Sequence, residues 1–179
     1  MPKSKKPRKK QHYTKVALPS VPQHMIDYVK DHIRLIGFAV EVKLPLGRFD
    51  VNDVHELNEF INWTGYTAYK LQHDRSRWTR EQADEVISTQ IQVSEALKSL
   101  YQRTNKIWDK KSDEEWDSRT FTPTGDELKI FSNSMALLYP FMSELYEDSP
   151  KLLTRFWAEA KGIMRSPQKK VEGLLVRTY

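Results

Sequence analysis

Between residues 86 and 107, seven side chains recur at spacings that alternate between four and three without a miss: Val86, Gln90, Val93, Leu97, Leu100, Thr104 and Ile107. Such a spacing places all seven on one face of an α-helix. Ile87 and Ile91 widen the stripe, which is typical of a helix in a bundle rather than of a bare two-stranded coiled coil. The polar members Gln90 and Thr104 leave open whether this face pairs within one chain or in a homodimer.

Stripes with the same helical spacing predict four further helices. The first carries Ile26, Val29, Ile33, Ile36 and Val40, and the second carries Val54, Leu57, Ile61, Thr64, Ala68 and Leu71. After the long stripe come Leu128, Phe131, Met135, Leu138, Met142 and Leu145, and finally Leu153, Phe156, Trp157, Ala160 and Met164.

Capping signals mark where these helices begin. Ser20, Asp50 and Ser149-Pro150 predict three of the starts, and the pairs Thr79/Gln82 and Thr124/Glu127 are capping boxes, the first preceded by Trp78. Pro45 and Gly47 end the first stripe. Gly65 inside the second stripe costs about 1 kcal/mol relative to alanine. Pro140 predicts a kink or a break in the fourth, because proline lacks a backbone donor and clashes with the preceding turn.

These patterns predict an all-α protein: a single irregular bundle of about five helices over residues 21–165. An extended basic arm (1–20) precedes it and a basic tail (166–179) follows it. No stretch longer than four residues alternates in the manner of a strand, and 179 residues suit one domain. The longest apolar run, at eight residues, is far below the roughly 20 that span a bilayer. With no cysteine, we expect a cytoplasmic protein without membrane contact.

Charge is segregated along the chain. Residues 1–15 hold seven cations and no acid, residues 16–160 hold 17 Lys/Arg against 23 Asp/Glu, and residues 161–179 hold five basic residues and one acid. The sequence therefore describes an acidic body with two basic ends. A surface basic throughout, as in proteins that track nucleic acid with one whole face, is not indicated.

The arm is the first candidate binding segment. Its lysines and arginines can neutralise phosphates and release counterions, which is binding without base information. Pro2 and Pro7 disfavour a helix, so we expect the arm to be extended and to become ordered on a partner. An import-like address or a role in solubility are the alternatives. The cations concerned are Lys3, Lys5, Lys6, Arg8, Lys9, Lys10 and Lys15.

A second candidate nucleic-acid contact lies in the segment "HDRSRWTR", where Arg75, Arg77 and Arg80 surround Trp78. This mixture suits base stacking combined with phosphate contact. Alternatively, Trp78 only staples the start of the third helix. Arg80 favours the binding interpretation, because a cation in the first helical turn opposes the helix dipole.

Signatures of catalysis or of metal and cofactor binding are weak. The five histidines lack metal-ligand spacing, so surface histidines are expected, including His55 beside Asp53, Glu56 and Glu59. Glu127-Leu-Lys129 copies the E-x-K of many metal-dependent nucleases, but that motif sits on a strand and Glu127 already belongs to a capping box. Phosphate-binding glycine loops are missing from the sequence. We therefore predict no catalytic residue, no metal and no cofactor.

The segment "KSKKPRKKQHYTK" followed by helices resembles a loose class of small proteins encoded by phages and prophages of proteobacteria. The resemblance covers the first twenty residues and the helical pattern of 50–100, and implies a bacterial cytoplasm and a setting in phage–host or replication functions. Our prediction is a non-enzymatic binding protein whose arm contacts nucleic acid or a nucleoprotein while the acidic body docks a protein partner. The alternatives are an inhibitor or adaptor with an incidental arm and, more remotely, a metal-dependent nuclease.

Overall fold

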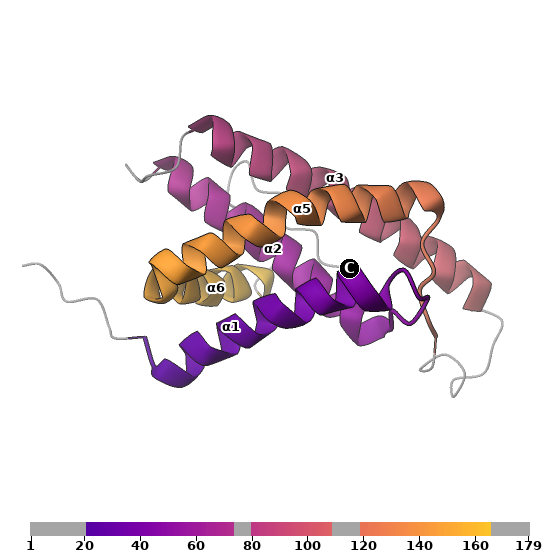
Figure 1. The fold of residues 1–179 in the computed structure, drawn as a ribbon, viewed down its shortest axis with the longest axis horizontal. Coiled ribbons are helices and arrows are strands. Elements are labelled where there is room, and N and C mark those ends of the chain that lie inside the picture. Colours follow the sequence, from indigo (N-terminus) through magenta and orange to yellow (C-terminus); the bar gives the residue numbers. More distant parts are fainter. Residues whose placement is uncertain (1–20, 74–79, 109–118, 166–179) are drawn as a thin grey trace, which may run out of the picture.

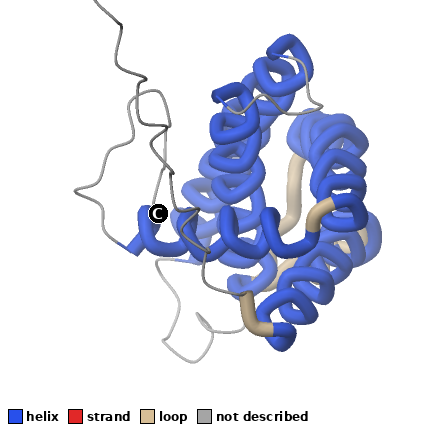
Figure 2. The backbone as a smooth tube through the Cα atoms, turned by 90° about the vertical axis from the view of Figure 1, so that its left-hand side faces the viewer, coloured by secondary structure: helices blue, strands red, loops and turns tan. Residues whose placement is uncertain are grey.

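The computed structural model describes residues 21–73, 80–108 and 119–165, which fold into five α-helices (Figure 1). These are α1 (Gln23–Phe38), α2 (Val51–His73), α3 (Arg80–Trp108), α5 (Gly125–Asp148) and α6 (Pro150–Arg165), with a π-helical turn η1 (Ala39–Lys43) directly after α1. In Figure 2 the described chain consists of helices joined by short loops. Its only strand-like contact is one isolated bridge between Phe49 and Phe121. The all-α prediction is confirmed.

The helices pack into a bundle in which α2 and α3 share the most extensive contact (Figure 1). Helix α5 packs on α3, α6 packs on α2, and α1 contacts α2, α5 and α6. One apolar core joins all five helices, and its largest fully buried side chains include Trp63, Phe60 and Phe131. No helix within the described ranges combines the length and the apolar character needed to cross a membrane.

The predicted stripes are the buried faces of these helices. Every described member of the first, second and third stripes is buried except Ile107, which is 62% exposed at the end of α3. In α5 all members but Leu128 are buried, and in α6 Trp157 is half-buried. The heptad pattern of α3 therefore ends at Thr104.

The helix starts follow the capping predictions in three described cases, one of which is α6, which begins at Pro150 as Ser149-Pro150 predicted. Thr124 and Glu127 form the predicted capping box, and Asp50 accepts from the backbone N–H groups of Asn52 and Asp53 at 2.8 and 3.0 Å. The prediction of Ser20 as a cap is wrong, because α1 begins at Gln23 with Pro22 as its N-cap residue. Thr79 and Trp78 lie outside the described residues.

Pro140 does not break α5, which runs unbroken from Gly125 to Asp148 and bends partway along its length in Figure 1. Both Pro140 and Ala136, whose carbonyl loses its helical donor, are exposed. Water can therefore satisfy that carbonyl, which is the condition under which a helix tolerates an internal proline.

Gly65 is explained by the close approach of α2 and α3. A methyl group added at Gly65 would lie 3.0 Å from Cγ and Cδ of Gln90, a buried side chain whose amide donates to Ser94 Oγ at 3.2 Å. Gly65 and Gln90 each weaken the apolar pattern of their helix, but in the structure the Gln90 side chain packs against the space that the missing side chain of Gly65 leaves.

A matched pair of glycine substitutions tests this packing. We expect Gly65→Ala to lower the free energy of unfolding by about 1 kcal/mol, because overpacking costs about 1–3 kcal/mol and outweighs the gain in helix propensity. Gly162→Ala in α6, where an added methyl group meets nothing within 4 Å, should instead raise it by up to about 1 kcal/mol. Urea unfolding monitored by circular dichroism measures both. Equal changes in the two variants would contradict the packing.

Candidate functional site

The α1–η1 segment and the start of α2 enclose a pocket of about 520 Å³. The π-helical turn continues the chain beyond α1, and Gly47 then reverses it with a positive φ of 65°. This reversal brings the first turns of α2 alongside α1, so that residues about twenty positions apart share one wall. The pocket is lined by Tyr28, Asp31, His32, Leu35, Ile36, Phe38, Ala39, Lys43, Asn52, Asp53 and Glu56.

Large exposed apolar side chains gather on the same segment, and three of them, Tyr28, Leu35 and Phe38, also line the pocket. Seven such side chains are exposed in the described part of the chain, and five of them lie between residues 28 and 46. Leu35 is 64% exposed and Phe38 is 55% exposed, although α1 already buries a complete inward stripe. We call these five residues the α1 apolar face: Tyr28, Leu35, Phe38, Val42 and Leu46.

The rim of the pocket is acidic. Lys43 is its only lining cation, and its Nζ forms ion pairs with Asp53 and, at 3.6 Å, with Asp50. Burial lowers the pKa of Lys43, but the bonds and charges of these two carboxylates outweigh burial and raise it overall. Because Lys43 is already held by Asp50 and Asp53, the carboxylates of Asp31 and Glu56 leave the rim negative.

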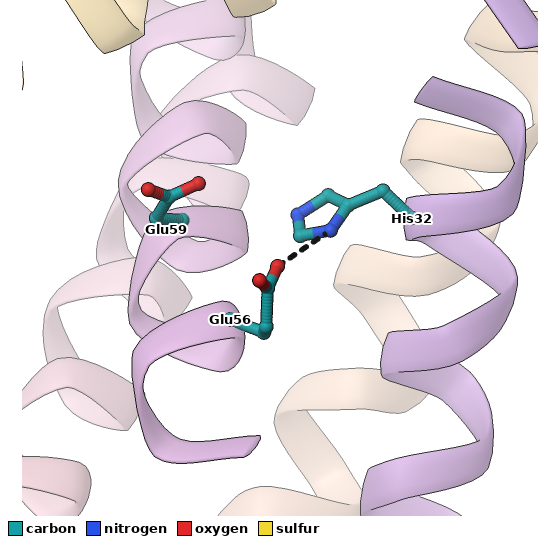
Figure 3. Close-up of side chains that lie close together, drawn as sticks. All are labelled: His32, Glu56 and Glu59. Carbon is teal, nitrogen blue, oxygen red and sulfur yellow. Dashed lines mark ion pairs between the residues drawn. The ribbon is translucent and has the colours of Figure 1, made fainter. Parts of the chain in front are cut away.

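His32 is the buried polar group of the pocket, only 4% exposed. Its Nδ1 lies 2.9 Å from Glu56 Oε2 (Figure 3). Burial lowers the pKa of His32 to about 4, a shift that Glu59 opposes and Lys161 reinforces. The ring is therefore neutral at pH 7, donates its Nδ1–H to Glu56 and leaves Nε2 buried without a hydrogen-bond partner. The prediction of a surface histidine is wrong here, whereas His24 and His55 are exposed as expected.

Glu59 lies one turn beyond Glu56 on α2 and pairs with Lys161 of α6, whose Nζ is 3.1 Å from its Oε2. The same ammonium lies 4.7 Å from the ring centroid of Trp157 and 5.7 Å from that of Tyr28. Burial and then the charge of Glu59 raise the pKa of Glu56. His32, Glu56 and Glu59 thus form a ligand-type cluster that the sequence spacing did not predict.

Most of the binding residues predicted from sequence lie outside the described residues: Lys3, Lys5, Lys6, Arg8, Lys9, Lys10, Lys15, Arg75, Arg77 and Trp78. Arg80 is described, exposed at the start of α3, with its Nε 3.9 Å from Asp84 Oδ2 one turn along the helix. The Asp84 carboxylate offsets part of the repulsion between the Arg80 cation and the positive end of the α3 dipole. An exposed ion pair of this kind contributes little to stability.

The nuclease-like motif is part of helix α5 rather than of a strand. Glu127 accepts from the backbone of Thr124 and pairs with Arg103. Burial raises the pKa of Glu127, but its bonds to Thr124 and Ser99 and the charge of Arg103 outweigh burial and lower it. Residues two apart on a helix do not face each other, so Glu127 and Lys129 do not converge on one ion. Glu127 therefore caps the N-terminus of α5.

Comparisons with family models, with curated proteins and with solved structures found no match. Function is therefore inferred from the geometry of the α1–η1–α2 region.

Proposed function

We propose that this protein is a binding protein that docks a cationic amphipathic segment of a partner protein on the α1 apolar face, while its basic arm contacts nucleic acid or a nucleoprotein. The observation that carries the docking proposal is the concentration of five of the seven exposed large apolar side chains between residues 28 and 46. Apolar patches gathered in this way, beside a pocket and rimmed by polar groups, mark interaction surfaces.

The five side chains of the α1 apolar face come from one helix and the segment after it, which favours docking of one segment over docking of a folded domain. A stable interface between folded proteins takes about 800 Å² per partner, whereas a single amphipathic helix needs only a groove and a few anchor pockets. The pocket of about 520 Å³, which Leu35 and Phe38 help to line, can accept anchor side chains of such a helix.

The charge of the rim favours a cationic partner over a second copy of the chain. A two-fold dimer through this face would place the Asp31 and Glu56 carboxylates against their own equivalents, and like charges across an interface are unfavourable. A segment with lysines or arginines beside its apolar residues would instead meet opposite charge. The proposal for the basic arm is separate from the docking proposal and is supported by the sequence alone.

The docking proposal is tested with two labelled model peptides of about 16 residues, both carrying leucines at helical spacing. One has lysines on its polar face and the other has glutamates. We expect the lysine peptide to bind at least tenfold more tightly by fluorescence anisotropy. Leu35→Ser and Phe38→Ser should each weaken its binding about tenfold, because each loses roughly 1.5 kcal/mol of apolar burial.

Ile107→Ser is the matched control, since Ile107 is as exposed as Leu35 but lies at the end of α3. It should leave peptide binding unchanged, and all three variants should keep the wild-type melting temperature. Equal affinity for both peptides, no binding to either, or an equal loss in Ile107→Ser would overturn the docking proposal. Dimerisation abolished by Leu35→Ser would assign the face to a second copy. Peptide binding seen only after removal of residues 1–15 would assign the face to the arm.

A further inference from the structure

Three side chains of metal-ligating type converge from two helices at the side of the pocket. His32 comes from α1, and Glu56 and Glu59 stand one turn apart on α2 (Figure 3). One donor atom from each residue lies within 4.8 Å of the other two. Two atoms bound to the same metal ion at about 2.0–2.2 Å are at most roughly 4.4 Å apart, so the donor atoms of this cluster are spaced nearly as closely as the ligands of one ion.

The imidazole of His32 points to a ligand independently of the carboxylates. Its Nε2 is buried and has no hydrogen-bond partner among the described residues. In Figure 3 this nitrogen is turned toward Glu59, while Nδ1 faces Glu56. A buried acceptor without a partner is costly, and a bound group that uses its lone pair would remove that cost.

We propose that the cluster binds a divalent transition-metal ion, with His32 Nε2 and Glu59 as direct ligands and Glu56 as a positioning residue. The neutral ring has its lone pair on Nε2 because Nδ1–H donates to Glu56. A carboxylate that holds the second ring nitrogen of a metal-bound histidine fixes the tautomer and orientation of the ring. Imidazole and carboxylate together suit Zn²⁺ better than Mg²⁺, which prefers oxygen ligands and retained water.

Lys161 competes with the metal for Glu59. Its ammonium supplies one positive charge against the two carboxylates, so the cluster keeps a net negative charge with His32 neutral. Its contacts with the rings of Trp157 and Tyr28 hold it near the site without Glu59. Metal binding displaces this ammonium from Glu59, and removing its charge should tighten binding.

The test is calorimetric titration of the tag-free full chain with Zn²⁺ alone at pH 7. We expect one Zn²⁺ per chain, bound at least thirtyfold more tightly than Mg²⁺. Zn²⁺ should also raise the melting temperature.

Four variants separate the roles of the residues. Glu59→Gln should weaken Zn²⁺ binding at least thirtyfold, and Glu56→Gln, whose amide oxygen can still accept from Nδ1–H, about tenfold. Lys161→Met, which keeps an apolar stem beside Trp157, should tighten binding several-fold. His55→Gln, the exposed neighbour of Glu56, should change nothing. Circular dichroism confirms that each variant folds.

Three results would overturn the proposal: no Zn²⁺ binding in the wild type, binding lost in His55→Gln but kept in Glu59→Gln, or equal affinity for Mg²⁺. The second result would assign the ion to surface groups.

Discussion

Replacing Leu97 by aspartate is expected to unfold the helical domain. Leu97 is fully buried on the inward face of α3, where the stripes of α2 and α5 meet it. An aspartate there buries a charge without a partner, at a cost on the order of 5 kcal/mol, which is comparable to the whole stability of an ordinary domain. We expect loss of the cooperative thermal transition and of most of the helical circular-dichroism signal at 25 °C.

Gln92→Asp is the control for this substitution, because Gln92 is exposed on the same helix. It introduces the same side chain and the same charge into α3, so any cost in helix propensity is shared, and its melting temperature should stay within a few degrees of wild type. A Leu97→Asp protein that melts like Gln92→Asp would show that the α3 stripe faces solvent or a second chain. Light scattering over a range of concentrations distinguishes those two results.

The contrast between Leu97 and Leu35 shows what periodicity predicts and what it leaves out. A stripe predicts the inward face because the spacing of three and four is a local property of the helix. Leu35 and Phe38 lie between the members of the α1 stripe in the sequence, so the periodic pattern does not predict whether they are buried. Their burial depends on whether another element covers them, which the sequence does not specify. The sequence did show that they are apolar residues outside a stripe that is already complete, and this indicated an exposed apolar face.

The His32 cluster was missed for a different reason. Motif searches for metal sites rely on fixed spacing within one helix or loop, and Glu56 and Glu59 alone match only a pair of surface carboxylates. The third member, His32, lies 24 positions before Glu56 and reaches it only because the turn at Gly47 reverses the chain. One sequence signal was present: His32 follows Val29 by three and precedes Ile36 by four, so it adjoins the buried stripe of α1 and not its polar side.

Removing the charges of the arm is expected to abolish most nucleic-acid binding without affecting the fold. The variant replaces the seven cations between Lys3 and Lys15 by glutamine, so that the length of the chain is kept. If the arm neutralises about five or six phosphates, the logarithm of the wild-type binding constant should fall with the logarithm of salt concentration at a slope near −4 to −5, at about 0.7–0.9 per phosphate. The variant should give a much flatter slope and much weaker binding to DNA and RNA.

The melting temperature of this variant should equal that of wild type, because the core described above is built from residues between Val29 and Ala160. Sequence preference should also change little, since lysines that contact phosphates read no bases.

Arg75→Ala with Arg77→Ala, made in the presence of the arm, measures whether the segment before α3 adds a second contact, which would flatten the slope by one or two further units. Phe38→Ser should leave the slope unchanged, because the docking face and the arm are proposed to bind different partners.

Two results would contradict the role of the arm. One is a wild-type protein that has no affinity for nucleic acid at low salt, and the other is a glutamine variant that binds as tightly as wild type. Either result would leave the α1 apolar face as the binding surface and the arm as a solubility or address segment.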